Sequence, residues 1–291
     1  MASRSRQAHP RLMLTVAATA VALLAFAANS ILCRLALASG AIDAASFTVV
    51  RLVAGAGTLL VVALATGRAR QRGAGSWRSG ALLFAYAMGF SLAYVALSVA
   101  TGALILVGAV QITVLMVAIA GGERPQPLQW AGLSAALGGF VYLVWPGLAA
   151  PSPQGSLMMT AAGVAWGFYT LRGRGSADPI SATTDNFVRA VPLVLVVAVV
   201  MLRDLHATPR GLVLAALSGA VTSGLGYVVW YTALKGLTAT RAGIVHLAVP
   251  VIAALAGVLF MGEPVSLRLV VATAAILGGV ALVLAGREKT G

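Results

Sequence analysis

Charged residues, and acidic ones above all, are scarce in this chain of 291 residues. Asp and Glu together number seven and all charged residues make up 9% of the chain, whereas hydrophobic residues make up 60%. A soluble protein of this length cannot hide that much apolar surface, because its own surface needs polar cover. Several uncharged runs also exceed the roughly 20 residues that a membrane-spanning helix needs. The composition therefore predicts a polytopic helical membrane protein. The alternating strands of about ten residues that mark a membrane barrel are not visible.

Other absences narrow the function. The single cysteine, Cys33, can form no intrachain disulfide, so it does not indicate the compartment. No Walker-type phosphate loop is present, which argues against a pump driven by ATP. No HExxH, CxxC or acidic cluster offers a metal site, and the three histidines (His9, His206 and His246) belong to no readable Ser/His/Asp set. The sequence thus predicts neither an enzyme nor a bound cofactor.

Ten helices account for the apolar runs. The uncharged runs 79–122 and 125–171 are each too long for one pass and must fold back, the first near 98–102 and the second at its prolines. The resulting fold class is all-α and integral to the membrane. The predicted helices cover about 12–38, 44–66, 79–98, 101–121, 127–146, 155–171, 181–202, 211–234, 239–261 and 266–286.

The basic residues test this division. With the N-terminus inside, fourteen of the 20 Lys and Arg lie in inner loops and tails, four lie in outer loops, and Arg51 and Arg189 fall within helices. This bias follows the positive-inside rule, and it accounts for the net charge of +13 without a nucleic-acid partner. No signal peptide is evident. We expect a multi-pass protein of the inner (plasma) membrane, with cytoplasmic tails at 1–11 and 287–291.

The two halves of the chain match each other. Arg34 and Arg51 are 17 residues apart, as are Arg172 and Arg189, and the pair Gly138-Gly139 recurs 140 residues later. The halves therefore form two five-helix repeats, 12–150 and 151–286. Five is an odd number, so the second repeat enters the membrane with the opposite orientation. Inverted repeats around a central cavity are a plan of secondary transporters.

An ordered set of motifs then suggests a family. Gly122-Glu123 and Gly262-Glu263-Pro264 each follow a long apolar run and precede a helix with a Gly-Gly pair. The chain resembles the drug/metabolite transporter superfamily over nearly its whole length, and within it the EamA-type exporters, with its closest likeness to the YddG type. The resemblance implies an exporter of small metabolites that works by alternating access. The first repeat departs from the pattern, since it has no proline where the second has Pro250.

Candidate substrate-binding residues are the polar His246 and Asn29 and several aromatic side chains in mid-helix. His246 lies four residues before Pro250, whose ring frees the carbonyl of His246 from its helical partner. The alternative for His246 is a bond to a neighbouring helix, and for each aromatic it is plain packing. The aromatic candidates for lining an apolar pocket are Tyr86, Phe90, Tyr94, Trp166, Tyr169, Tyr227 and Trp230.

Arg51, Glu123, Arg189, Pro250 and Glu263 are interpreted as gating or structural residues. The two arginines lie about two turns into their helices, where they are expected to pair with carbonyls or extend to the interface. Capture of a substrate carboxylate is the alternative. The two glutamates close their helices beside glycine and suit interfacial groups or gating ion pairs.

These patterns favour a secondary transporter that exports small metabolites, with apolar and aromatic amino acids as its substrates and the lipid bilayer as its surroundings. One chain holds a complete cavity, so a monomer is sufficient. Three alternatives stay open: uptake instead of export, a carrier of drugs, organic cations or nucleotide sugars, and an integral-membrane enzyme acting on lipids.

Overall fold

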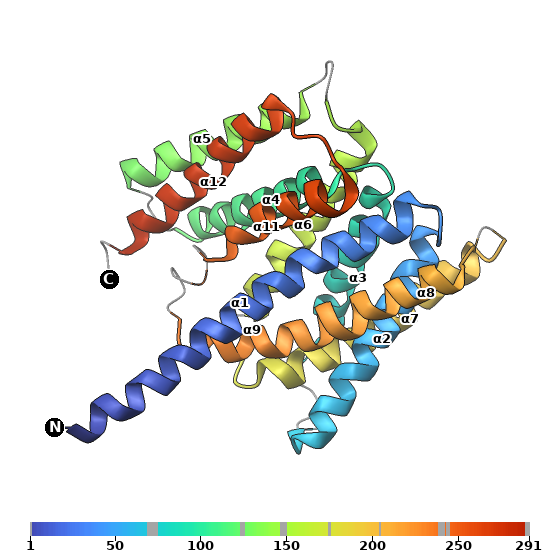
Figure 1. Ribbon diagram of the computed structural model, residues 1–291, viewed down its shortest axis with the longest axis horizontal. Coiled ribbons are helices and arrows are strands. Elements are labelled where there is room, and N and C mark those ends of the chain that lie inside the picture. Colours follow the sequence, from blue (N-terminus) through green and yellow to red (C-terminus); the bar gives the residue numbers. More distant parts are fainter. Residues whose placement is uncertain are drawn as a thin grey trace.

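A bundle of helices makes up the structure (Figure 1). The computed structural model describes residues 2–68, 75–122, 126–145, 150–173, 176–203, 205–237, 242 and 245–288, with side chains described only between 13 and 283. Within these ranges the only β-type contact is an isolated bridge between Ile42 and Ala207. The elements are α1 (Ala2–Ala38), α2 (Ala44–Ala65), α3 (Trp77–Tyr94), α4 (Val99–Ala120), α5 (Pro127–Val144), α6 (Pro153–Gly173), α7 (Pro179–Val200), α8 (Pro209–Leu217), the π-helix η2 (Ser218–Leu225), α9 (Gly226–Leu234), α11 (Ala248–Met261) and α12 (Leu267–Glu288).

The predicted helices agree with these elements, apart from a few boundaries. α1 begins at Ala2, well before the predicted start at residue 12, although its apolar span begins only at Met13. The predicted helix 211–234 is a continuous run of α8, η2 and α9. The predicted helix 239–261 is described as α11 from Ala248 onward, and most of its earlier residues lie outside the described part of the chain.

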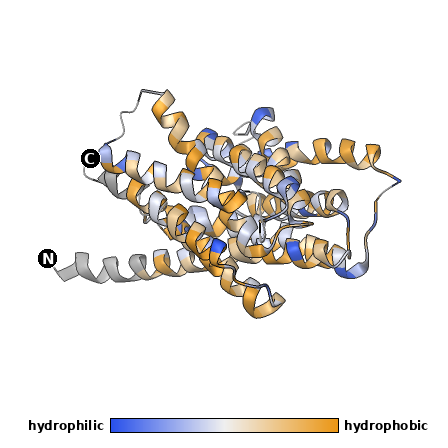
Figure 2. Cartoon of the chain, turned by 90° about the horizontal axis from the view of Figure 1, so that it is seen from above, coloured by the Kyte–Doolittle hydropathy of each residue, from blue (hydrophilic) through white to orange (hydrophobic). Residues whose placement is uncertain are grey.

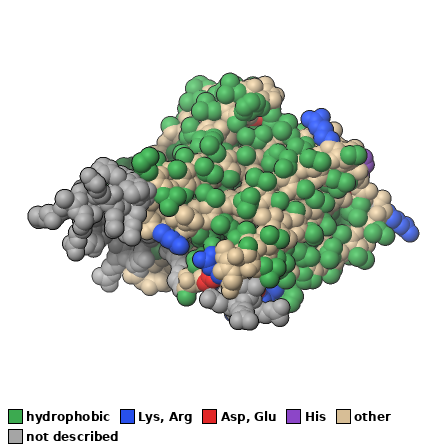
Figure 3. All heavy atoms as spheres, turned by 60° about the horizontal axis from the view of Figure 1, so that its bottom comes forward, with side chains coloured by type: hydrophobic (Ala, Val, Ile, Leu, Met, Phe, Trp, Pro, Cys, Tyr) green, Lys and Arg blue, Asp and Glu red, His purple; other side chains and the backbone are tan. Residues whose placement is uncertain are grey.

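The described helices are those of a multi-pass membrane protein. Six of them are long and apolar enough to cross a bilayer, and α11 and α12 add shorter apolar helices. Hydrophobic residues run along most of the helices in Figure 2, and hydrophobic side chains cover most of the face shown in Figure 3. Large apolar side chains such as Val200, Leu259 and Phe260 are 75% or more exposed, as a lipid-facing surface requires.

Both chain termini lie at the same end of the bundle (Figures 1 and 2). We call this the N/C end, and it includes the start of α3 and the start of α7. The opposite end, called the far end, includes the end of α1 and the start of α4. Asp43 closes a contact at the far end by accepting a hydrogen bond of 2.7 Å from the His206 amide. Burial raises the pKa of the Asp43 carboxyl, but this bond and those from Ser46 outweigh burial and lower the pKa below its ordinary value.

Helices distant in sequence pack together throughout the bundle. α5 packs on α12, α2 on α7, and α4 on α11, while α3 packs on α6 and α1 on α9. Glycine permits the closest approach, because no side chain stands between the backbones. A Cβ on Gly132 would lie 2.5 Å from the Gly279 carbonyl oxygen, where no real atom fits, so α5 and α12 depend on both glycines.

The π-helix η2 lies against α2 in the same way. A Cβ on Gly219 would overlap the Arg51 carbonyl, and a Cβ on Gly55 would lie 3.2 Å from the Gly219 carbonyl oxygen. π-Helical turns are rare and often occur at functional sites. This close packing of η2 on α2 sets the position of Arg51 within the bundle.

We expect Gly219→Ala to destabilise the protein, because the added methyl group must push η2 away from α2. Overpacking of this kind costs about 1–3 kcal/mol. The measurement is the midpoint of thermal unfolding of the purified protein in detergent. Gly138→Ala is the matched control, since nothing lies within 4 Å of its new Cβ. Equal midpoints for the two variants would contradict the packing argument.

Candidate functional site

A cavity enclosed by helices from both halves of the chain is the candidate site, and we call it the central cavity. It has an empty volume of about 520 Å³, its opening included. Aromatic rings, aliphatic side chains and a few polar groups line it, contributed by α1, α2, α3, α4, α6, η2, α9 and the region at the start of α11. Its lining residues are Phe26, Asn29, Ser30, Arg51, Tyr86, Phe90, Ala103, Leu106, Val107, Trp166, Thr222, Ser223, Tyr227, His246 and Val249.

The structure brings six of the predicted substrate-binding residues together around this cavity: Asn29, Tyr86, Phe90, Trp166, Tyr227 and His246. The other three pack outside its lining. Tyr94 is fully buried against Phe90, with ring centroids 4.7 Å apart. Tyr169 stacks on the ring of Trp166, and Trp230 packs against Phe26.

Trp166 is the centre of the aromatic wall. Its ring lies 4.6 Å from Tyr86, 5.0 Å from Tyr169 and 5.5 Å from Tyr227, measured between centroids. Tilted and offset ring pairs at these distances attract one another beyond their buried area. The wall joins α3, α6 and α9, so an apolar ligand in the cavity would contact helices of both halves.

Two neutral polar groups lie beside this wall. The Asn29 side-chain oxygen accepts hydrogen bonds from Ser218 at 2.7 Å and from Thr222 at 3.2 Å, so its acceptor capacity is used. The His246 ring lies 5.6 Å from Phe26 and 5.8 Å from Trp230 between centroids. No hydrogen bond joins the His246 ring to another residue within the described ranges, and the ring lines the cavity.

Arg51 does not lie at the interface, contrary to the expectation from its sequence position. Its side chain is 2% exposed and lines the central cavity. Nη2 donates to the Tyr86 hydroxyl at 3.0 Å, and the guanidinium lies 4.8 Å from the Phe90 ring centroid. The Gly219 backbone lies directly against the Arg51 backbone, so this part of α2 is packed inside the bundle and not at its edge.

Glu263 links three helices at the far end. Its two carboxylate oxygens lie 3.0 and 2.8 Å from the Val99 amide, at the first residue of α4. An ion pair of 3.7 Å joins it to Arg34, which also donates to the carbonyls of Tyr94 and Val95. A carboxylate at a helix N-terminus is favoured by the helix dipole. We call this group, Arg34, Glu263 and the Val99 amide, the far-end latch.

Pro250 lies at the third position of α11, where its missing N–H leaves no helical bond broken. The sequence had placed it in the interior of the helix 239–261. A turn at Leu247 separates His246 from α11. Leu247 has right-handed helical backbone angles (φ −64°, ψ −15°), so the regular hydrogen bonding is interrupted between His246 and Pro250 while the backbone stays close to helical.

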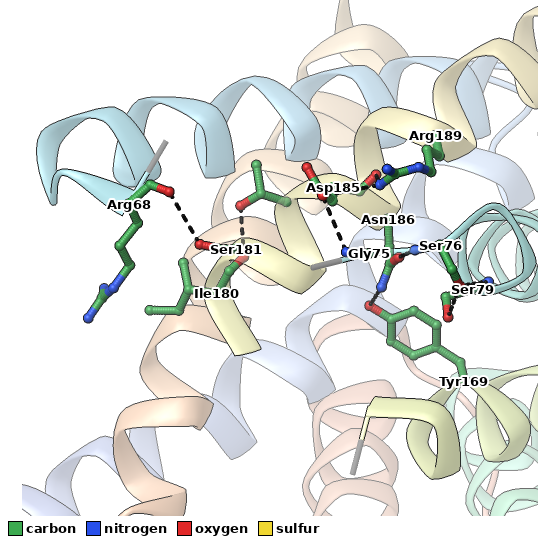
Figure 4. A network of polar contacts seen from close by, with 11 residues as sticks. Arg68, Gly75, Ser76, Ser79, Tyr169, Ile180, Ser181, Asp185, Asn186 and Arg189 are labelled. Atoms are coloured by element: carbon green, nitrogen blue, oxygen red, sulfur yellow. Dashed lines mark hydrogen bonds and ion pairs between the residues drawn. The ribbon is translucent and has the colours of Figure 1, made fainter. Parts of the chain in front are cut away.

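At the N/C end, polar residues of α7 hold the segment before α3 (Figure 4). Asn186 accepts a hydrogen bond from the Ser76 amide at 3.0 Å, and Asp185 accepts one from the Gly75 amide at 3.2 Å. Arg189 pairs with Asp185 at 3.2 Å and donates to its carbonyl. We call the contacts of Asp185 and Asn186 with Gly75 and Ser76 the N/C-end latch. Glu123, predicted as a gating residue, lies outside the described residues.

Sequence reasoning missed Phe26, Thr222 and Ser223 as lining residues. The hydroxyl residues gave a signal, since they lie between Gly219 and Gly224 in an otherwise apolar run. The sequence suggested a gating ion pair for Glu263 but did not identify Arg34 as its partner, because the two residues are far apart in sequence.

Comparisons with known proteins agree with this architecture. The model of the EamA-like transporter family matches residues 153–285. An uncharacterized protein of Pseudomonas aeruginosa is 49% identical over 94% of this chain and 95% of its own length. An uncharacterized transporter of Archaeoglobus fulgidus is 36% identical over 24% of this chain and 25% of its own length. A crystal structure covering 92% of this chain and 98% of its own shares the fold, with a TM-score of 0.66 and 22% identity. The chain belongs to the EamA-like transporter family of the drug/metabolite transporter superfamily and is a multi-pass membrane protein.

Proposed function

We propose that the protein is a secondary transporter of the inner (plasma) membrane that exports small metabolites, with apolar and aromatic amino acids as its substrates. The single observation that carries the proposal is the central cavity, whose aromatic wall joins helices from both halves of the chain. An apolar side chain would pack against Trp166, Tyr86 and Tyr227. The polar end of the substrate would meet Asn29, His246 and the neighbouring polar groups. In this proposal the protein is not an enzyme, and one chain is sufficient.

The proposed mechanism is alternating access between two inverted five-helix repeats, 12–150 and 151–286, with both termini in the cytoplasm. The helix pairing supports it, because counterpart helices of the two repeats pack on each other: α2 on α7, α4 on α11, and α5 on α12. The remaining pairs also correspond, since α3 packs on α6 as α9 packs on α1. Such pairing is what a twofold axis between repeats produces. The cavity lies between the two polar latches, each of which could open one end.

The test is efflux of a preloaded amino-acid mixture from sealed proteoliposomes. We expect aromatic and other apolar amino acids to leave selectively. Trp166→Ala should slow their efflux about tenfold, because a large part of the aromatic wall is lost. His246→Ala tests the polar end in the same assay. Trp130→Ala is the matched control, since this indole is 49% exposed and lies outside the cavity lining.

Efflux no faster than from empty vesicles would reject the amino-acid assignment. An aromatic wall also fits apolar drug-like molecules, which are the second candidate class. Release of such molecules, without release of any amino acid, would favour that second class.

A further inference from the structure

The guanidinium of Arg51 is a buried positive charge without a counter-charge. The residues that line the central cavity include one charged side chain, that of Arg51, and no carboxylate. Within the described ranges, the ion pairs join Arg34 to Glu263, Arg68 to Asp178, and Arg189 to Asp185, so none includes Arg51. Buried charges in proteins are normally paired, because removing an ion from water is costly.

The partners that Arg51 does have are neutral and incomplete. Nη2 donates to the Tyr86 hydroxyl at 3.0 Å, and Nε lies 3.4 Å from the Ser223 hydroxyl. The guanidinium also lies 5.3 Å from the Tyr86 ring centroid and 4.8 Å from that of Phe90. Nη1 is buried and has no hydrogen-bond partner in the described part of the chain. An arginine carries its charge at all accessible pH values, so it cannot relieve this situation by losing a proton.

These contacts hold the guanidinium in place and leave part of its fork unused. A planar fork of N–H donors matches the geometry of a carboxylate, and the two form paired, charge-assisted hydrogen bonds. A cationic ligand would be repelled, and a neutral one would leave the buried charge without a counter-charge. The chemistry of the site therefore selects an anion, and the surrounding rings select one with an apolar body.

The ammonium group of an amino acid finds no comparable partner. No carboxylate is among the residues that line the cavity. The Asn29 oxygen already accepts two hydrogen bonds, from Ser218 and Thr222. Hydroxyls and the His246 ring are left as acceptors, and these are neutral groups.

We propose that the central cavity is a binding site for aromatic and other apolar monocarboxylates, held through their carboxylate by Arg51, and that an amino group on the ligand is not required. This inference rests on the proposed function in taking the central cavity as the transport site, and it adds the group that the site recognises. Apolar amino acids then bind as one subset of a wider class of organic anions. Amines that lack the carboxylate do not bind.

The experiment measures binding to the purified full-length protein in detergent, by calorimetry, with four probes that share one ring. They are L-phenylalanine, 3-phenylpropanoate without the amino group, 3-phenylpropanamide without the charge, and phenethylamine without the carboxylate. We expect the first two to bind, and the amide and the amine to bind at least tenfold more weakly. Tight binding of the amide or the amine would overturn the proposal, whatever any variant does.

Variants then assign the carboxylate contact to Arg51. Arg51→Gln should weaken binding of 3-phenylpropanoate at least tenfold. Arg51→Lys keeps the charge and loses the fork, so its affinity should lie between those of the unmodified protein and Arg51→Gln. Arg268→Gln is the matched control, because this arginine donates to the Trp145 carbonyl and lies outside the cavity lining. If the position 51 variants fail to fold, the four probes still decide the matter on the unmodified protein. Unchanged binding in a folded Arg51→Gln protein would reject the assignment.

The outcome separates this inference from the proposed function. Selective carboxylate binding without efflux of any amino acid would support the anion site and reject amino-acid export. Efflux of amino acids together with binding that ignores the carboxylate would support export and reject the role of Arg51.

Discussion

We expect Glu263→Ala to raise about tenfold the population of the conformation that is open at the far end of the bundle. Its carboxylate accepts from the Val99 amide and pairs with Arg34, so it joins α1, α4 and the end of α11. Its side chain is 11% exposed, and hydrogen bonds to charged groups in such settings are worth about 1.5–3 kcal/mol each. A change of 1.4 kcal/mol alters a population ratio tenfold. In a transporter with two alternating openings, these contacts exist only in the state that is closed at the far end. Their loss therefore destabilises that state.

The measurement uses a cysteine placed in the cavity. The native Cys33 is first replaced by Ala, and Ala103, which lines the cavity and is 1% exposed, becomes the reporter through Ala103→Cys. Alkylation by a membrane-impermeant maleimide is followed in right-side-out and in inside-out membrane vesicles. We expect Glu263→Ala to raise the rate of alkylation only in the vesicles whose orientation exposes the far end to the reagent.

Two controls accompany this prediction. Glu263→Asp keeps the charge and should retain most of the effect of the latch. Arg268→Gln removes a charge whose hydrogen bond is to the Trp145 carbonyl and not to the latch. An alkylation rate that is unchanged by Glu263→Ala, or raised equally in both preparations, would contradict the role of the far-end latch.

We expect Asn186→Ala to favour opening at the opposite end of the bundle, the N/C end. Asn186 is 6% exposed, accepts from the Ser76 amide and donates to the Tyr169 hydroxyl at 3.4 Å (Figure 4). The substitution leaves the half-buried Ser76 amide without that acceptor, which costs about 1 kcal/mol, the low end for a group that water partly reaches. Alkylation of the same reporter should therefore rise several-fold in the preparation that exposes the N/C end.

The matched control for this variant is Thr184→Ala on the same helix. Its hydroxyl donates to the Ile180 carbonyl within α7, so its loss leaves the contact with α3 intact. If Asn186→Ala and Glu263→Ala raise labelling in the same preparation, the two latches do not act on opposite ends. Alternating access in the proposed form would then be wrong.

Much of the fold could be predicted because the membrane restricts it. A run of about 20 uncharged residues has to form a helix, since the bilayer core offers no water to unpaired backbone groups. Prolines and glycines then mark the ends: α5, α6 and α7 begin at Pro127, Pro153 and Pro179, close to the predicted starts. The early start of α1 was not predictable, because the polar residues before Met13 lie outside the apolar span that gave the signal.

The candidate site was predictable only in part. Mid-helix aromatics pointed to the cavity, and Trp166, Tyr86 and Tyr227 line it. The same argument also selected Tyr94 and Trp230, which pack outside the lining. Helical spacing shows that residues share a face of one helix, but it does not show whether that face meets a neighbouring helix or a cavity.

The sequence by itself determined that this is a helical membrane protein, because composition, run length and charge placement are properties of single segments. Only the tertiary structure decided that Arg51 lies beside the cavity, that Glu263 meets Arg34 and Val99, and that Asn186 meets Ser76. Each of these contacts joins residues on different helices. Their geometry depends on how closely the helices approach, and that distance is set by pairs such as Gly219 against Arg51, which no single segment contains.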